Sequence, residues 1–166
     1  QAEEGDVVIV SGTLGDHGMA LAQAANQWVL GGEVVSDTAA LNGLVGEMLE
    51  ATREIHVLRD PTRGGVAAKL NLIARASRVG IEVDEEKLPV KTAVWQACEL
   101  AGVHPLTVAN EGKLVAVVPE REAEKLVTAM RRHPLGKETA VIGRVVAAHR
   151  GEVMLVQPLG RQRVVV

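Results

Sequence analysis

Apolar residues fall into two patterns along this chain, and each pattern predicts a different kind of element. Short apolar or strand-like runs predict strands at residues 7–10, 55–58, 114–118, 140–146, 153–156 and 163–166, and the alternation of Ile81 and Val83 with Glu82 and Asp84 predicts a half-exposed strand. Apolar residues spaced by three or four positions predict helices across 21–28, 41–49, 66–74, 90–101 and 123–130. The mixture, with strands clustered near the end of the sequence, predicts an α+β fold in which a mixed β-sheet is packed by about five helices.

Residues at the helix ends refine these bounds. Ser36-Asp37-Thr38 is a cluster of capping residues and predicts the start of the second helix. Gly31-Gly32 is expected to stop the first helix, and Pro119 to open the fifth. We expect Ala101 to face the core from the fourth helix and residues 106–109 to be extended.

The composition limits the class of protein. With 166 residues the chain can form one domain with a sizeable core, built from aliphatic residues because Phe and Tyr are missing. The net charge of -3 gives no reason to expect a nucleic acid or an anionic membrane as partner. No apolar run approaches the ~20 residues of a membrane span. A single cysteine, Cys98, excludes an internal disulfide and fits a cytoplasmic protein.

The segment Asp60–Gly65 (DPTRGG) is the first candidate for chemistry, because it joins a predicted strand to a helix whose N–H groups would face a bound ligand. Asp60 adds a hard oxygen that suits Mg²⁺, and Arg63 adds a guanidinium that suits phosphate. Gly64 and Gly65 would let the backbone approach the ligand closely. The segment predicts a phosphate-handling turn, and the alternative is a loop whose Asp and Thr only cap the helix.

Two further turns carry candidate residues. Asp16 and His17 stand at a predicted helix start, where an anion could bind and His17 could transfer a proton, unless Asp16 only caps the helix. Glu111, in the NEGK turn before a buried strand, is a candidate general base, unless the turn is an ordinary polar one. Cys98 is expected to be buried, and neither His104 nor His133 has partners at metal-ligand spacing, so no zinc site is expected.

These motifs, in this order, resemble the HypE family of hydrogenase maturation proteins. The matching segments are SGTLGDHGMA, VSDTAALNGLV, RDPTRGG, VANEGKLVAVVP, HPLG and IGRVV, and the likeness covers residues 5–166. HypE is related to aminoimidazole ribonucleotide synthetase, selenophosphate synthetase and thiamine-monophosphate kinase. DPTRGG alone is typical of this whole superfamily, whereas NEGK and HPLG favour HypE over a paralogue such as selenophosphate synthetase.

The resemblance implies an ATP-dependent enzyme with two domains. In the family, an N-terminal domain forms the homodimer and supplies most contacts to ATP and Mg²⁺, and a C-terminal α+β domain closes over the nucleotide. The enzyme dehydrates a carbamoylated cysteine at its extreme C-terminus to a thiocyanate, which provides cyanide for NiFe hydrogenase. Its partners are the carbamoyltransferase HypF and the HypC–HypD complex. Residues 1–166 would form the C-terminal domain alone, without the N-terminal ATP-binding domain and the cysteine tail.

The resemblance also implies roles for single residues. Glu111 would be the base that takes protons from the substrate nitrogen, with His17 as the second candidate, and Arg63 would stabilise charge on the transferred phosphate. Asp60 would be the Mg²⁺ ligand. The residues that bind ATP would be Asp16, Asp60, Thr62, Gly64 and Gly65.

Two hypotheses follow for the function of the chain. It is either the catalytic half of a HypE-type dehydratase or a non-catalytic domain that docks other maturation proteins. Because the family's nucleotide-binding half and terminal cysteine are missing, we expect the isolated chain neither to turn over ATP nor to carry thiocyanate. It should be a monomer, although exposed strand edges could pair.

Overall fold

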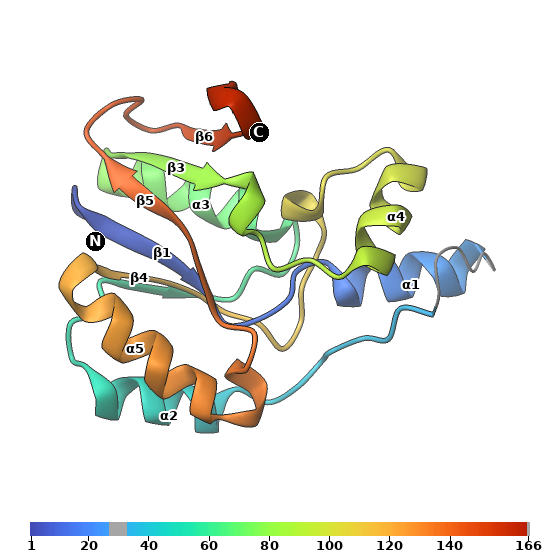
Figure 1. The fold of residues 1–166 in the computed structure, drawn as a ribbon, viewed down its shortest axis with the longest axis horizontal. Coiled ribbons are helices and arrows are strands. Elements are labelled where there is room, and N and C mark those ends of the chain that lie inside the picture. Colours follow the sequence, from blue (N-terminus) through green and yellow to red (C-terminus); the bar gives the residue numbers. More distant parts are fainter. Residues whose placement is uncertain (27–32, 166) are drawn as a thin grey trace.

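The computed structural model describes residues 1–26 and 33–165, and its centre is a seven-stranded mixed sheet with the order β2-β4-β1-β5-β3-β6-β7 (Figure 1). The strands are β1 (Asp6–Val10), β2 (Val57–Arg59), β3 (Gly80–Asp84), β4 (Val115–Pro119), β5 (Ala140–Val146), β6 (Val153–Val156) and β7 (Gln162–Val164). Strands β3 and β6 pair in parallel, and all the other neighbouring strands of this sheet are antiparallel.

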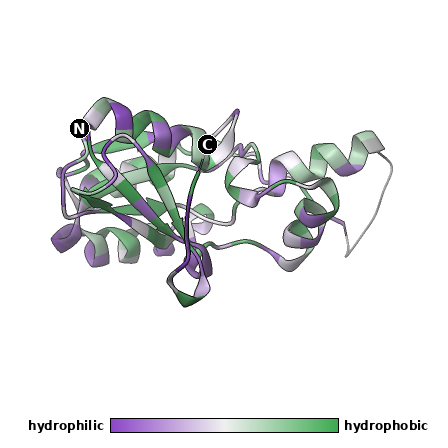
Figure 2. Ribbon diagram, turned by 90° about the horizontal axis from the view of Figure 1, so that it is seen from above, coloured by the Kyte–Doolittle hydropathy of each residue, from purple (hydrophilic) through white to green (hydrophobic). Residues whose placement is uncertain are grey.

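Helices lie on both faces of the sheet. They are α1 (Asp16–Asn26), α2 (Asn42–Ala51), α3 (Gly65–Ser77), α4 (Thr92–Ala101) and α5 (Glu120–Arg132), with 3₁₀ helices η1 (Glu85–Lys87), η2 (Pro105–Thr107), η3 (Pro134–Gly136) and η4 (Pro158–Gly160). Helix α3 covers one face, and α2 and α5 lie side by side on the other (Figure 1). Helices α1 and α4 pack on each other beyond one end of the sheet (Figure 2). The predicted α+β fold with a mixed sheet is therefore confirmed.

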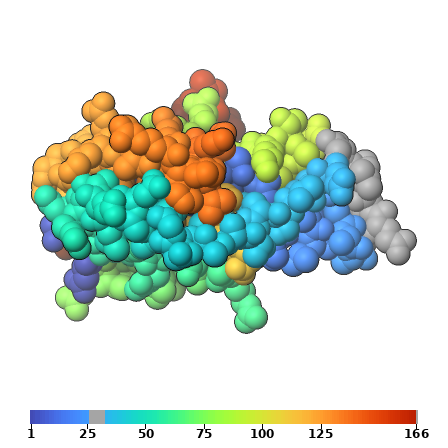
Figure 3. All heavy atoms as spheres, turned by 90° about the horizontal axis from the view of Figure 1, so that it is seen from below, coloured from blue at the N-terminus to red at the C-terminus, as the bar shows by residue number. Residues whose placement is uncertain are grey.

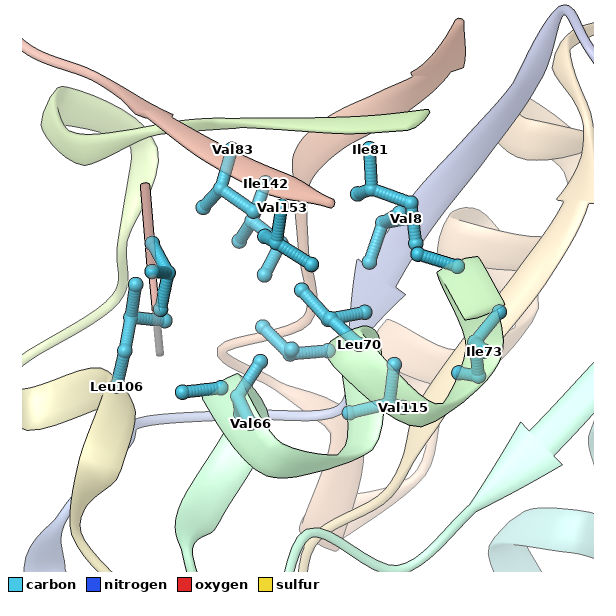
Figure 4. Close-up of a cluster of buried hydrophobic side chains, with 14 of the residues drawn as sticks. Val8, Val66, Leu70, Ile73, Ile81, Val83, Leu106, Val115, Ile142 and Val153 are labelled. Carbon is cyan, nitrogen blue, oxygen red and sulfur yellow. The ribbon is translucent and has the colours of Figure 1, made fainter. Parts of the chain in front are cut away.

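The main core lies between the sheet and α3 and consists of aliphatic side chains (Figure 4). Val66, Leu70 and Ile73 form the buried face of α3, as the apolar spacing predicted, and they meet Val8 and Val115 from the sheet. Burying each such side chain contributes about 1.5–3 kcal/mol, so a core without Phe or Tyr reaches its stability through many interlocking branched residues.

Several local predictions were wrong, and each has a physical reason. Ser36-Asp37-Thr38 does not cap a helix: α2 begins at Asn42, and the three side chains bind residues distant in sequence instead. Residues 105–107 form the 3₁₀ helix η2 rather than an extended piece, because the His104 side chain accepts a hydrogen bond from the Leu106 N–H at 3.2 Å. Ala101 is exposed, since α4 ends there and Gly102 turns the chain away.

The strand predictions were closer to the structure. Strands β5 and β6 have the predicted bounds, β1 and β4 are displaced by one residue at an end or at both, and β2 lies one to two residues further along than predicted. The last two residues of the predicted first helix, its expected stop at Gly31-Gly32 and the last residue of the predicted final strand lie outside the described residues.

Candidate functional site

The three predicted motifs meet at one edge of the sheet, although they are far apart in sequence. Strand β4 lies between β2 and β1 and is antiparallel to both. The carboxyl ends of β1 and β2 therefore adjoin the amino end of β4. The turn at 11–15 follows β1, the segment Asp60–Gly65 follows β2, and the turn at 110–113 precedes β4. Strand order thus creates the candidate site.

A cavity of about 230 Å³ lies between two of these loops and the segment before α2, and it is lined by Ala39, Leu41, Asp60, Thr62, Asn110, Glu111, Gly112 and Lys113. It brings together Asp60, the candidate metal ligand, Glu111, the candidate base, and Thr62. Larger hollows of about 400 Å³ over the open part of the sheet and about 830 Å³ between α2 and α5 contain none of the candidate residues. We therefore take the smaller cavity as the candidate site.

Asn110 connects the loops of this site, and it is a residue whose role the sequence did not indicate. Its side chain is buried, and its Oδ1 accepts a hydrogen bond from the Gly15 N–H at 2.8 Å. Its Nδ2 donates to the carbonyl oxygens of Pro61 and Val108 at 3.3 and 2.9 Å. The side chain therefore bonds the turn after β1, the turn after β2 and its own turn.

The two glycines of DPTRGG are explained by the fold itself. Both have positive φ angles, +76° at Gly64 and +63° at Gly65, a region that favours glycine. A Cβ on Gly65 would lie 2.4 Å from the carbonyl oxygen of Leu106 and 2.5 Å from that of Val108. The Gly65 N–H donates to the Thr62 carbonyl at 2.9 Å, so this group at the helix start already has a partner. Close packing against residues 106–108 therefore requires glycine at position 65.

The structure does not bring Asp16 or His17 into the cavity. Asp16 is fully buried at the start of α1, and its Oδ1 lies 2.7 Å from Nζ of Lys91. His17 Nδ1 is 2.8 Å from Oγ of Ser36 and 3.2 Å from Oγ1 of Thr38. A direct contact between Asp16 and a nucleotide would require Lys91 to move, and His17 holds a surface segment in place.

That segment, residues 33–41, forms one wall of the site and runs across the surface between α1 and α2 (Figure 3). Asp37 makes an ion pair with Lys113, and both side chains are largely buried. A Cβ on Gly112 would lie 2.3 Å from the carbonyl oxygen of Asp37 and 2.6 Å from the amide nitrogen of Ala39. The segment is therefore packed tightly against the loop that carries Glu111. This contact was not predicted, because Ser36-Asp37-Thr38 was expected to cap a helix.

Arg63 and the remaining candidate residues lie outside the cavity. Arg63 is exposed and is not one of the lining residues. Cys98 is buried among α1 and α4 side chains, where burial raises the pKa of its thiol to about 11 and fits the predicted structural role. Burial also lowers the pKa of His104, against an opposing hydrogen bond to Glu85. His56 Nδ1 lies 2.8 Å from Oδ2 of Asp6, so this histidine has a hydrogen-bond partner outside the cavity.

The cavity provides oxygen donors for a magnesium ion, although it is not a closed metal site. Within residues 1–26 and 33–165, no group of three or more His, Cys, Asp or Glu side chains could hold a metal. Mg²⁺ commonly takes one or two carboxylates and completes its shell with water and substrate phosphate. Asp60, Thr62 and Glu111 line one cavity and carry carboxylate and hydroxyl oxygens, which are the donor types of such a site. The part of the chain that the structure describes also has no helix long and apolar enough to cross a membrane.

The fold and the cavity together define an α+β domain with a carboxylate- and hydroxyl-bearing site where the end of β2 meets the start of β4. Residues 3–156 match the family model of the AIR synthase related protein, C-terminal domain. The chain belongs to this family.

The similar proteins described below are HypE proteins. The chain is 50% identical over 165 residues to carbamoyl dehydratase HypE of Rhizobium leguminosarum bv. viciae, covering 99% of the chain and 47% of that relative. Crystal structures of a HypE–HypF complex and of the hydrogenase maturation protein HypE with ATP match with TM-scores of 0.95 and 0.93. Their identities are 45% and 40%, over 99% of this chain and 53% and 51% of theirs. The resemblance to HypE is confirmed, and the chain spans about half the length of the curated relatives it matches.

Proposed function

We propose that this chain is the C-terminal, catalytic half of a HypE-type carbamoyl dehydratase. The observation that carries the proposal is the cavity in which Asp60, Thr62 and Glu111 meet, in a chain 50% identical to a carbamoyl dehydratase. The structural similarity to HypE with bound ATP supports a nucleotide as the phosphate source. In this proposal the cavity binds the reacting end of Mg-ATP and the carbamoyl group.

The proposed reaction removes water from an S-carbamoyl-cysteine. The carbamoyl oxygen attacks the γ-phosphorus of ATP and ADP leaves, which forms a C–O–P linkage. The nitrogen then loses two protons, the C–O bond breaks, phosphate departs and a C≡N bond forms. The product is a cysteine thiocyanate, and the oxygen atom leaves in the phosphate.

The lining residues divide these tasks. Glu111, the half-buried carboxylate of the cavity, takes the first proton from the substrate nitrogen, and the departing phosphate takes the second. Asp60 would hold Mg²⁺ beside the phosphate, with Thr62 as a hydroxyl donor. Mg²⁺, when bound, neutralises charge on the phosphate. Arg63 lies on the same loop, where its guanidinium would stabilise charge on the transferred phosphate. Because His17 lies outside the cavity, it stays the second candidate base behind Glu111.

The similarity also supports a biological setting. A HypF-type carbamoyltransferase would supply the carbamoyl group, since a similar structure is a HypE–HypF complex. The cyanide would pass through a HypC–HypD complex to the iron of NiFe hydrogenase, in the cytoplasm.

The test uses a full-length protein that contains this chain, carbamoylated at the C-terminal cysteine that the resemblance to HypE implies, and measures ATP-dependent phosphate release. Glu111→Gln should lower the rate by about 10²–10⁴-fold while ATP binding is retained, because it removes a general base. Glu124→Gln, an exposed carboxylate on α5, is the matched control and should leave the rate unchanged. The isolated 166 residues should release no phosphate.

Two outcomes would contradict the proposal. Full activity in Glu111→Gln would remove the base from its assigned position. A non-catalytic docking domain would be favoured if the protein bound its HypF-type partner normally while neither Glu111→Gln nor Asp60→Asn changed turnover.

A further inference from the structure

We infer that Asn110 is the positioning residue that holds the three loops of the proposed site in their relative places. This inference rests on the dehydratase function proposed above. Asn110 is 1% exposed and lines the cavity, yet it carries no charge and has no reactive group. Its value to the site lies in what it connects.

The hydrogen bonds of Asn110 reach separate parts of the chain. The Gly15 N–H, which donates to Oδ1, belongs to the turn that opens α1. Pro61 accepts twice, from Nδ2 at 3.3 Å and from the Asn110 backbone N–H at 3.0 Å. Because Pro61 follows Asp60 and Asn110 precedes Glu111, the two bonds to Pro61 set the spacing between the candidate metal ligand and the candidate base.

Few side chains could replace this one. The position requires an acceptor for a backbone N–H and donors for two backbone carbonyls on one short, buried group. An ionised Asp offers no donor, and a Ser offers one in place of two. An Asp here would place a carboxylate oxygen against the carbonyls of Pro61 and Val108, which would push the loops apart. The amide thus fits the position by its hydrogen-bonding pattern.

Loss of the Asn110 side chain would affect catalysis by changing the distance between the base and the phosphate contact, not by removing a reacting group. The base and the phosphate contact lie on different loops, and a displacement of about 1 Å between reacting groups lowers a rate about 10²-fold. Asn110 itself touches no reacting atom in the proposed mechanism. Its loss should therefore lower kcat more than it changes the KM for ATP, because binding depends on Asp60 and its surroundings.

Asn110→Asp and Asn71→Asp form a matched pair for the test. The Asn71 Nδ2 also donates to two backbone carbonyls, those of Ala67 at 3.0 Å and Val165 at 2.8 Å, but Asn71 lies on α3 and does not line the cavity. In the full-length protein, Asn110→Asp should lower kcat at least about tenfold and change the KM for ATP less than about threefold. Asn71→Asp should keep kcat within about twofold of the original.

Amide chemical shifts provide a readout that does not depend on activity. Asn110→Asp should move the amide signals of Asp60, Thr62 and Glu111, and Asn71→Asp should leave them in place. If Asn110→Asp does not fold, Asn110→Ser makes the same comparison without a buried charge. Equal kcat values for the two Asp variants, or unmoved signals at Asp60 and Glu111, would overturn the inference. If the unsubstituted protein released no phosphate, only the proposed function would be refuted. The chemical-shift changes would still support the positioning role of Asn110.

Discussion

Replacing Gly65 by alanine tests whether the DPTRGG loop is fixed by packing against residues 106–108. The structure gives Gly65 a φ of +63° and places a Cβ there 2.4 Å from the carbonyl oxygen of Leu106 and 2.5 Å from that of Val108. Both obstacles are backbone atoms, which cannot turn away as a long side chain can. The new methyl group must therefore move the loop or η2.

Two terms contribute to the cost. A non-glycine residue in the left-handed region costs about 1–2 kcal/mol, and forcing an extra carbon into a packed interior costs typically about 1–3 kcal/mol more. We expect Gly65→Ala to lower the free energy of unfolding by about 2–5 kcal/mol in total. That is a large part of the roughly 5–15 kcal/mol that stabilises a typical domain.

Gly102→Ala separates the two terms. Gly102 has a similar φ of +68°, but a Cβ at this position would meet no heavy atom within 4 Å, so only the backbone strain applies. Urea unfolding followed by far-UV circular dichroism should show Gly65→Ala less stable than Gly102→Ala by about 1–3 kcal/mol. Equal stabilities within about 0.5 kcal/mol would refute the rigid contact between the loop and residues 106–108.

Three further predictions concern single side chains. Burial raises the pKa of Cys98 from 9.0 to about 11, so the thiol should resist thiol reagents at neutral pH until the chain unfolds. Between about pH 9 and 11 the original protein should lose stability compared with Cys98→Ala, because only the unfolded thiol ionises in that range. The pKa of His104 is lowered, and its ring accepts a hydrogen bond from the Leu106 N–H. The free energy of unfolding should therefore fall as the pH drops below about 6.5, the ordinary pKa of histidine, and should fall less in His104→Asn. Equal pH profiles of the two proteins in urea unfolding would contradict this. Leu44→Ala, at a fully buried site, should cost about 2–5 kcal/mol, against less than about 1 kcal/mol for Leu49→Ala on the exposed side of the same helix, both measured by thermal unfolding.

Local sequence patterns were sufficient for most elements of the fold. Strand β6 is an apolar run, β5 is rich in β-branched residues, and α3 has a clear apolar face, so all three could be placed from neighbouring residues alone. Helix α2 was located by its apolar spacing, but its start was placed too early. Ser36-Asp37-Thr38 has the composition of a cap, and only the tertiary fold shows that Asp37 pairs with Lys113.

The candidate residues were named from the sequence, but their arrangement was not predictable from it. Asp60 and Glu111 lie near each other because Val57 to Arg59 pair with Val115 to Val117, a contact between segments far apart in the chain. Apolar runs do not specify their pairing partners. The role of Asn110 could not be predicted for the same reason. Its hydrogen bonds go to loops whose positions depend on the strand pairing.

The size of the cavity bears on what the proposed site can bind. Pockets that enclose a drug-sized ligand usually measure about 300–1,000 Å³, and the cavity around Asp60 and Glu111 measures about 230 Å³. It can therefore surround a phosphate group and a carbamoyl group, but not a whole nucleotide. Binding of ATP would need a second surface to cover its base and ribose. Relatives about twice the length of this chain have room for such a surface, which is why Mg-ATP should bind the isolated chain weakly and shift mainly the amides near Asp60 and Glu111.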